Sequence, residues 1–373
     1  MARHLYFHIP FCPKLCPYCS FYVETGTANK NRAFLDALLG EVARAPEPLK
    51  PTTIYLGGGT PSALTTEQLA YLFDGLRARL DLTALEEFTI EVNPATVRAE
   101  KAQTLRAGGV TRISLGVQSW DDGLLKTLGR VHDSRQAAQT FELLRTAGFD
   151  NINVDLMFAV PGQTLAQWRE TLERTISFQP EHISTYCLTY EEDTEYFLKL
   201  QSGLLQQDDE RDAAFFETTM DALTAAGYLQ YEISNYTRSG RESRHNQAYW
   251  GGADYRGFGP SAFSTSELKR WQNIPDTAEY TRRILAGECA ISFTETLTQE
   301  TRRGEVLAFE MRTHGGIDAR ALGPWKAKLQ EFRELGFIED VGDRVVLTRR
   351  GKLMADSVAE AFVGAPAGGS PQV

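Results

Sequence analysis

Three cysteines lie close together near the start of the chain, in the stretch "HIPFCPKLCPYCSFY". Cys12, Cys16 and Cys19 are separated by three and then two residues, so their thiolates can meet at one metal centre. Pro13 and Pro17 stiffen the loop, which lowers the entropy lost when the ligands gather. A structural zinc ion usually takes four nitrogen or sulfur ligands. A [4Fe–4S] cluster held by three cysteines instead keeps one iron open to another ligand.

The cysteine spacing alone leaves other sites open. A structural zinc ion held by the three cysteines and a histidine, either His8 or a more distant one, fits the same spacing. A set of unpaired buried thiols fits it as well. The chain has five cysteines, an odd number, and its first residues lack the apolar stretch of an export signal. A disulfide framework is therefore disfavoured, and we expect a reducing compartment, the cytoplasm.

Composition and charge restrict the partners. With 42% hydrophobic and 24% charged residues among 373, the chain is typical of a globular protein with one large and one smaller domain. The net charge of -10 disfavours general binding to nucleic acid or anionic lipid, because like charges repel. No apolar run reaches membrane-spanning length, so we expect no membrane anchor and at most a peripheral association through a partner.

The first half of the chain alternates short β-branched or aromatic runs with amphipathic helical stretches. Apolar strands separated by helices are typical of a parallel sheet covered by helices. Six such units predict an α/β fold with a partial (β/α)6 barrel of the TIM type. The six expected strands are residues 5–9, 53–56, 88–92, 112–117, 152–158 and 182–188.

The pattern changes after the sixth strand and divides the chain into four predicted regions. We expect the barrel to cover residues 1–227, followed by a connecting region of well-packed loops over residues 228–288, rich in Gly, Ser, Asn and aromatic residues. Residues 289–363 predict a smaller, mostly helical domain of winged-helix type, with a hairpin that turns at Gly342. The tail, residues 364–373, has the composition of a disordered segment.

Polar or glycine-rich residues end almost every predicted strand of the barrel. In a β/α barrel the loops after the strands share one face, and that face carries the active site. A single residue of this kind is more often a helix cap or a structural hydrogen bond, but several at one end of a sheet predict a ligand site. These features are the cysteine loop, the glycine run 57–59, Glu91, Gln118 and Asp155.

The motifs together resemble a known family. The pattern C-x-x-x-C-x-x-C, with the stretches "YFHIPFC", "GGGTPS", "EVNP", "SLGVQSW", "LGRVHD" and "VDLMFAVPGQT", resembles the radical S-adenosylmethionine (SAM) family over residues 4–360. The resemblance is to the branch that contains oxygen-independent coproporphyrinogen III oxidases (HemN) and haem chaperones of the HemW group. Its motifs are specific and cover nearly the whole chain.

This resemblance implies a set of cofactors. The three cysteines would bind a [4Fe–4S] cluster, SAM would chelate the open iron through its amino and carboxylate groups, and a flavodoxin or ferredoxin would supply electrons. Carboxylates in the SAM site would accept hydrogen bonds from the ammonium or the ribose, and an arginine would neutralise the SAM carboxylate. Carried over by motif, the SAM site comprises Tyr6, Tyr18, Gly58, Gly59, Thr60, Glu91, Gln118, Arg130 and Asp155.

Two features near the N-terminus separate the members of this branch. The oxidases carry a further cysteine two residues after the third, where this chain has Phe21. They also have an N-terminal extension, whereas this chain begins directly with the first expected strand. Both departures disfavour SAM-dependent oxidative decarboxylation of coproporphyrinogen III to protoporphyrinogen IX, which stays as the alternative function.

A second motif lies in the stretch "RHNQAYW". His245, Asn246, Tyr249 and Trp250 resemble the HNxxYW motif of the haem-chaperone branch. Imidazole is a common axial ligand of haem iron, and aromatic rings pack against a porphyrin. From the residues alone, a turn-capping histidine above two packed aromatics is the simpler interpretation. With the resemblance, we expect these residues to bind haem as cargo for delivery to an acceptor protein. The histidines with no recognisable constellation are His4, His132, His182 and His314.

Overall fold

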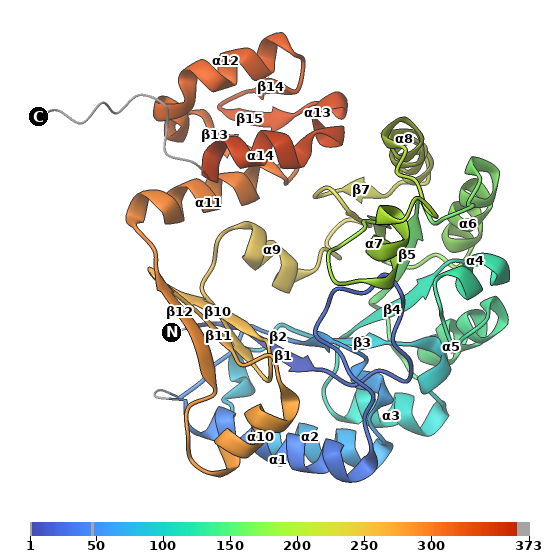
Figure 1. The fold of residues 1–373 in the computed structure, drawn as a ribbon, viewed down its shortest axis with the longest axis vertical. Helices are drawn as coiled ribbons and strands as arrows, with labels where there is room; N and C mark the ends of the chain where they lie inside the picture. The colour runs from blue at the N-terminus through green and yellow to red at the C-terminus, as the bar shows by residue number, and fades with distance from the viewer. Residues whose placement is uncertain (1, 46–47, 364–373) are drawn as a thin grey trace, which may run out of the picture.

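A twelve-stranded sheet forms the body of the molecule in the computed structural model, which describes residues 2–45 and 48–363. Six parallel strands follow one another in chain order across its centre and confirm the six predicted from the sequence. Together with the helices outside them they form the predicted α/β partial barrel (Figure 1). The strands are β1 (His4–Ile9), β2 (Thr53–Gly58), β3 (Glu87–Val92), β4 (Arg112–Gln118), β5 (Ile152–Phe158) and β6 (His182–Cys187).

Amphipathic helices cover the outside of the barrel and share one apolar core with its strands. Three of them, α2, α5 and α6, begin with a capping box, in which the N-cap side chain and a glutamine bond to each other's backbone N–H. In residues 2–45 and 48–363, every helix is too short or too polar to cross a membrane. The helices in this core are α1 (Ala28–Ala43), α2 (Thr66–Arg77), α3 (Ala99–Ala107), α5 (Ser134–Thr146), α6 (Leu165–Ser177) and α8 (Asp209–Ala225). Two short helices, α4 (Asp122–Thr127) and α7 (Glu195–Gln201), pack in a separate, smaller apolar cluster.

The barrel strands alternate apolar and polar side chains. On β1, Leu5 and Phe7 are fully buried in the core shared with the helices, so His4, Tyr6 and His8 face the inside of the barrel. The same alternation puts polar side chains on the inner faces of the other strands. Among these inner residues are Thr53, Tyr55, Glu87, Thr89, Glu91, Arg112, Ser114, Asn153, Asp155, His182 and Ser184.

The sheet continues on both sides of the barrel with six more strands, five of which lie in residues 228–288, so the expectation of loops there is wrong. β9 (Tyr255–Phe258) pairs in parallel with β1, and β10 (Phe263–Ser266), β11 (Lys269–Asn273) and β12 (Ile291–Thr296) add to it antiparallel. β8 (Asn235–Thr237) and β7 (Leu229–Gln230) extend the other side. Glycine permits close strand contact here, because a Cβ at Gly257 would lie 2.2 Å from the Phe263 carbonyl oxygen. The same region holds helices α9 (Arg244–Trp250) and α10 (Thr277–Leu285).

The C-terminal unit stands beside the mouth of the barrel and has its own apolar core (Figure 1). Its helices surround a small antiparallel sheet, and the predicted hairpin is present, with Gly342 at a positive φ of 64°. The expected boundary at residue 289 precedes β12, which still belongs to the large sheet. The predicted tail, 364–373, lies outside the described residues. The elements are α11 (Gln299–Met311), β13 (Ile317–Asp318), α12 (Lys326–Glu334), β14 (Ile338–Val341), β15 (Arg344–Leu347), α13 (Arg349–Leu353) and α14 (Ala355–Val363).

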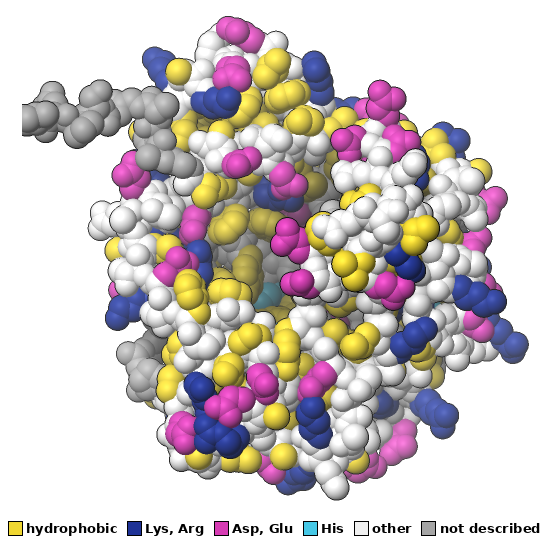
Figure 2. All heavy atoms as spheres, in the orientation of Figure 1, with side chains coloured by type: hydrophobic (Ala, Val, Ile, Leu, Met, Phe, Trp, Pro, Cys, Tyr) yellow, Lys and Arg dark blue, Asp and Glu magenta, His cyan; other side chains and the backbone are white. Residues whose placement is uncertain are grey.

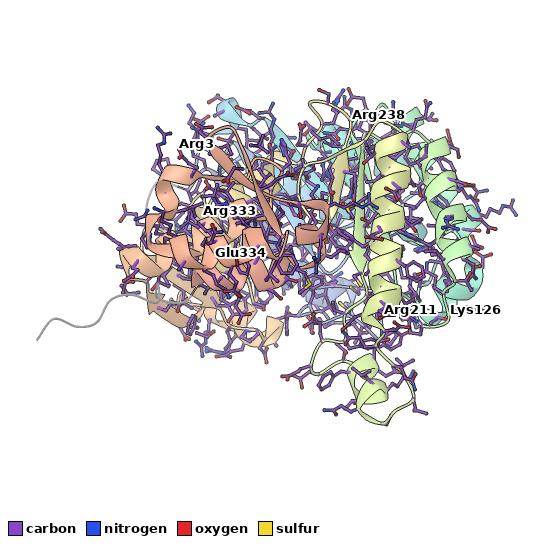
Figure 3. All side chains as sticks on the ribbon, turned by 90° about the horizontal axis from the view of Figure 1, so that it is seen from above. Arg3, Lys126, Arg211, Arg238, Arg333 and Glu334 are labelled. Carbon is purple, nitrogen blue, oxygen red and sulfur yellow. The ribbon has the colours of Figure 1, made fainter. Side chains whose placement is uncertain are left out.

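Seen from above, the C-terminal unit and the helices after β4 to β6 lie on opposite sides of the molecule. Arg333 and Glu334 mark the first, and Lys126 and Arg211 mark the second (Figure 3). Phe309 of α11 and Arg312, the residue that follows this helix, contribute to a cavity with residues of the barrel. The C-terminal unit therefore helps to enclose a site rather than standing apart from the barrel.

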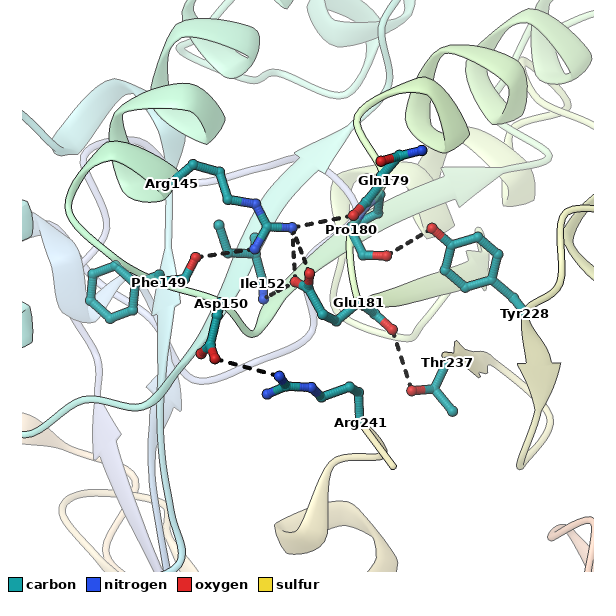
Figure 4. A network of polar contacts seen from close by, with 10 residues as sticks. All are labelled: Arg145, Phe149, Asp150, Ile152, Gln179, Pro180, Glu181, Tyr228, Thr237 and Arg241. Atoms are coloured by element: carbon teal, nitrogen blue, oxygen red, sulfur yellow. Dashed lines mark hydrogen bonds and ion pairs between the residues drawn. The ribbon is translucent and has the colours of Figure 1, made fainter. Parts of the chain in front are cut away.

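A polar network holds the N-terminal ends of β5 and β6 (Figure 4). This side of the sheet is opposite the C-terminal strand ends. The Glu181 carboxylate accepts a hydrogen bond from the Ile152 N–H at 3.0 Å and pairs with Arg145 at 2.8 Å. Thr237 donates to the Glu181 carbonyl oxygen at 3.3 Å, and Tyr228 donates to the Pro180 carbonyl oxygen at 2.7 Å. These bonds connect β5, β6 and β8 and so help to set the register of β5, which carries Asp155.

Candidate functional site: two neighbouring cavities in the barrel

The three cysteines lie on the loop after β1, and that loop is held by backbone bonds. The Cys12 N–H donates to the Glu24 carbonyl oxygen at 2.8 Å, and the Glu24 N–H donates to the Pro10 carbonyl oxygen at 2.8 Å. All three thiols are free. Burial raises the pKa of Cys12 and raises the pKa of Cys19 to about 11, so a bound cation is needed to keep these groups as thiolates.

Groups that can donate hydrogen bonds lie beside the thiols. In the described part of the chain, no three His, Cys, Asp or Glu side chains converge closely enough to hold one metal ion. Two groups are placed to donate hydrogen bonds to the sulfurs, since Arg130 Nη1 lies 3.8 Å from Cys16 Sγ and Thr60 Oγ1 lies 3.4 Å from Cys12 Sγ.

A cavity of about 490 Å³ opens between the cysteine loop and the ends of the strands. It is lined by the three cysteines and by eight of the nine residues predicted for the SAM site. The ninth, Tyr6, is not among its lining residues and lies in a second cavity described below. The eight are Tyr18, Gly58, Gly59, Thr60, Glu91, Gln118, Arg130 and Asp155.

Two buried carboxyl groups face this cluster cavity. Burial, and then the nearby Asp155, raise the pKa of Glu91 to about 7, and burial also raises the pKa of Asp155. Glu91 accepts hydrogen bonds from Tyr55 at 2.9 Å and from the Gly58 N–H at 3.2 Å. Arg130 Nη2 donates to the Gly116 carbonyl oxygen at 3.0 Å, which holds its guanidinium beside Cys16. An ammonium group bound between the carboxyls would restore their ionised forms.

The glycine run at the end of β2 lies where a larger side chain would meet neighbouring atoms. A Cβ at Gly59 would lie 2.7 Å from the Ile9 carbonyl oxygen, and a Cβ at Gly57 would lie 2.8 Å from Glu91 Oε1. These close approaches explain why glycine is required there. With the free thiols and the carboxyls, the cavity fits a cluster together with a zwitterionic ligand.

A second cavity, of about 440 Å³, lies between the barrel and the C-terminal unit. Figure 2 shows the molecule hollowed below the C-terminal unit, with hydrophobic side chains gathered on the walls. All four residues predicted to bind haem line this cavity, and Tyr6 lies with them. We name it the aromatic pocket, and its lining comprises Tyr6, Tyr55, Tyr186, Glu232, Ser234, Asn235, His245, Asn246, Tyr249, Trp250, Phe309 and Arg312.

His245 lies deep in the aromatic pocket, with only 3% of the residue exposed. Burial lowers its pKa to about 3, so the imidazole is neutral at pH 7. Its Nδ1 lies 2.8 Å from Thr53 Oγ1, whereas Nε2 is buried and has no hydrogen-bond partner among the described residues. A neutral imidazole with one unpaired nitrogen is the form that binds a metal.

The short helix that carries His245 is held at its N-terminus by a carboxylate. Glu87, on β3, accepts hydrogen bonds from the Arg244 N–H at 2.8 Å and from the His245 N–H at 3.1 Å. Ser243 caps the same helix through the Asn246 N–H at 3.3 Å. A buried carboxylate on the first free N–H groups satisfies them and stabilises the helix end. The position of His245 therefore follows from the barrel strands rather than from the helix alone.

Comparison with known proteins identifies the family. The model of the radical SAM superfamily matches residues 6–175. The heme chaperone HemW of Bacillus subtilis is 35% identical, and the match covers 97% of this chain and 99% of that protein. HemW of Escherichia coli is 33% identical, with 96% and 97% covered. This chain belongs to the HemW family. Membership of the radical SAM superfamily implies a [4Fe–4S] cluster and SAM, in agreement with the expectation from the motifs.

A solved structure shows that the HemW-family chain has the fold of a related enzyme. Coproporphyrinogen III oxidase (HemN) from Escherichia coli, described as a radical SAM enzyme, superimposes with a TM-score of 0.84. The two chains are 24% identical, and the match covers 96% of this chain and 89% of that one. At this identity the likeness establishes the architecture and leaves the chemistry to the residues of the site.

Several residues that line the two cavities lie outside the sequence motifs of the HemW family. Tyr55 and Tyr186 line both cavities and so form part of the wall between them. Glu232 and Arg312 bring a carboxyl and a guanidinium to the aromatic pocket from separate elements. The period-two alternation of β2 and β6 indicates that Tyr55 and Tyr186 face inwards. No sequence signal connects Arg312, at the C-terminal end of α11, to the barrel.

Proposed function

We propose that this protein binds haem in the aromatic pocket and delivers it to acceptor proteins, while the cluster cavity holds a [4Fe–4S] cluster and SAM. One observation carries this proposal. His245, Asn246, Tyr249 and Trp250 line a single pocket, and the buried, neutral His245 has an Nε2 without a partner. The pocket volume of about 440 Å³ is within the usual range for small-molecule sites.

The polar groups of the aromatic pocket suit a flat apolar ligand with acidic edges. Tyr249 and Trp250 offer ring faces, and the Arg312 guanidinium lies 5.5 Å from the Trp250 ring centroid. Arg312 pairs with the exposed Asp356, but its Nε is buried and has no partner in the described part of the chain. Haem carries two carboxylates, so a propionate at Arg312 is the arrangement that charge favours.

In the cluster cavity, Cys12, Cys16 and Cys19 would hold the cluster, which supplies an electron when SAM is cleaved. We propose that Glu91 and Asp155, which line this cavity, accept hydrogen bonds from the SAM ammonium or ribose hydroxyls, and that Arg130 pairs with its carboxylate. Free thiols suit a reducing compartment, for which we propose the cytoplasm. Reduction of the cluster requires a donor, for which a flavodoxin or ferredoxin is suited.

Oxidation of coproporphyrinogen III is the weaker candidate. Phe21 lines the cluster cavity where the oxidases resembled here have a further cysteine, and its side chain is 69% exposed. The cluster cavity therefore has one thiol fewer than in those oxidases, whereas all four residues that we propose to bind haem line the aromatic pocket. The likeness to HemN concerns the fold, so it does not favour the oxidase reaction.

The test is to add haem and coproporphyrinogen III separately to anaerobically reconstituted protein. We expect about four irons and four sulfides per chain from one cubane. We also expect tight haem binding, transfer of that haem to an apo-acceptor, and no SAM-dependent protoporphyrinogen. Turnover of coproporphyrinogen III would overturn the chaperone assignment, and stoichiometric zinc without sulfide would overturn the cluster assignment.

A further inference from the structure

His4, Thr53 and His245 form a hydrogen-bonded row inside the barrel. Strands β1 and β2 pair in parallel with His4 opposite Thr53, and α9 brings His245 over the same position. Thr53 Oγ1 lies 3.0 Å from His4 Nδ1 and 2.8 Å from His245 Nδ1. The two imidazole rings are edge to face, with centroids 6.4 Å apart. One hydroxyl group therefore bridges two histidines that are 241 residues apart in the chain.

The Thr53 hydroxyl group has one hydrogen, so it can donate a hydrogen bond to only one of the two imidazoles. The choice of protonated nitrogen in one ring therefore depends on that in the other. If His245 Nδ1 carries the hydrogen, it donates to Thr53, Thr53 donates to His4 Nδ1, and His245 Nε2 keeps a free lone pair. If Thr53 donates instead to His245, the hydrogen of His245 moves to Nε2. That N–H would then be buried with no acceptor among the described residues.

We infer that Thr53 and His4 act as positioning residues that hold His245 as the Nδ1–H tautomer, with the Nε2 lone pair directed to haem iron. The inference rests on the proposed function, because it needs His245 as the iron ligand. Histidine ligands commonly donate their other N–H to a fixed acceptor, which orients the ring and makes it a stronger donor to the metal. Here Thr53 Oγ1 is that acceptor. The Thr53 hydroxyl group in turn donates its own hydrogen bond to His4 Nδ1.

The chain offers a matched control at the neighbouring position. Thr52 Oγ1 is buried and has no hydrogen-bond partner among the described residues, so Thr52→Val removes a hydroxyl from the residue just before β2 without removing a bond. Thr53→Val removes the bridge at nearly the same volume, and Thr53→Ser restores a hydroxyl. His4→Phe removes the second acceptor and keeps an aromatic ring on the partly buried end of β1.

The experiment measures ferrous haem bound to the full-length, cluster-reconstituted protein by resonance Raman spectroscopy, together with haem affinity. A hydrogen bond from Nδ1–H strengthens the iron–histidine bond. We therefore expect Thr53→Val to lower the iron–histidine stretching frequency and to weaken haem binding about 10-fold. His4→Phe should lower the stretching frequency and the haem affinity by a smaller amount. Thr53→Ser should keep both at the parental values, and Thr52→Val should change neither. Iron content and circular dichroism verify that each variant is folded.

Two further outcomes separate this inference from the proposed function. If His245→Ala abolishes the iron–histidine band but Thr53→Val leaves its frequency and the haem affinity unchanged, the positioning role is wrong and the haem site stands. If His245→Ala leaves the band in place, His245 is not the ligand, and both the inference and this part of the proposed function fall.

Discussion

Tyr55 donates a hydrogen bond of 2.9 Å to Glu91 in the cluster cavity, and its ring lies on the wall shared with the aromatic pocket. On the pocket side the Tyr55 and His245 ring centroids are 5.2 Å apart. A ligand that binds Glu91 therefore acts on a side chain that also contacts the candidate haem ligand. This arrangement gives the two cavities a direct physical connection.

Replacing Tyr55 by Phe should shift the pH dependence of SAM binding upwards. Burial raises the pKa of Glu91 to about 7, and the hydrogen bond from Tyr55 opposes that increase. Losing the bond raises the pKa further, so a smaller fraction of Glu91 is ionised at pH 7 and the SAM ammonium is bound about 3- to 10-fold more weakly. Equilibrium dialysis from pH 6 to 9 measures the effect. Tyr71→Phe, which removes a bond to Asp36 on the surface, is the control, and identical profiles for all three proteins would contradict the role of Tyr55.

Glu91→Gln should make the protein relatively more stable as the pH rises. The pKa of Glu91 is about 7 in the folded state, above its ordinary value of 4.5. Between these values the unfolded chain releases the proton while the folded chain retains it, so the parent loses stability across this window. The stability difference between variant and parent should grow by up to about 3 kcal/mol from pH 4 to pH 8. Urea denaturation at both pH values measures it, and a constant difference would show that Glu91 titrates normally.

Arg312→Gln should weaken the binding of haem but not of haem dimethyl ester, which lacks free carboxylates. A propionate at the Arg312 guanidinium is a charge-assisted pair, and its loss should reduce haem affinity about 10-fold. The parent should prefer haem over the ester, and the variant should bind the two alike. Arg333→Gln is a control because Arg333, in the last turn of α12, pairs with Asp340 and is not among the residues that line the pocket. Equal discrimination by parent and Arg312→Gln would exclude this contact.

Glu181→Gln should destabilise the protein by about 2 kcal/mol and leave haem affinity unchanged. The carboxylate pairs with Arg145 and accepts the Ile152 N–H at the start of β5, and both side chains of the pair are mostly buried. Asp74→Asn breaks the exposed pair with Arg77 and should cost less than about 1 kcal/mol. Thermal unfolding compares the two variants. An equal loss of stability in both variants would mean that the network in Figure 4 contributes no more to stability than an exposed ion pair.

The sequence predicts the cluster cavity better than the aromatic pocket, and the reason is topological. Parallel strands in chain order bring their C-terminal ends to one face, so Glu91 and Asp155 were expected to lie near the cysteine loop. Tyr6 was expected there too, but it lines the aromatic pocket. Period-two alternation gives the inward direction of a side chain but not its depth along the barrel axis.

The row from His4 to His245 was beyond motif analysis because it depends on contacts between distant elements. The β1–β2 register brings His4 to Thr53, and Glu87 on β3 accepts hydrogen bonds from the first turn of α9, which carries His245. The region 228–288 was expected to form loops, since its glycine and polar content has low strand propensity. Pairing of β9 with β1 outweighs that propensity.

The most direct test of the account is the spectrum of haem bound to His245→Ala, with and without added imidazole. We predict that the substitution removes the histidine-ligated spectrum and weakens haem binding about 10- to 100-fold, with cluster content unchanged. Added imidazole should enter the space left by the side chain and restore the spectrum. A parental spectrum and affinity in His245→Ala without imidazole would contradict the assignment of the aromatic pocket as the haem site.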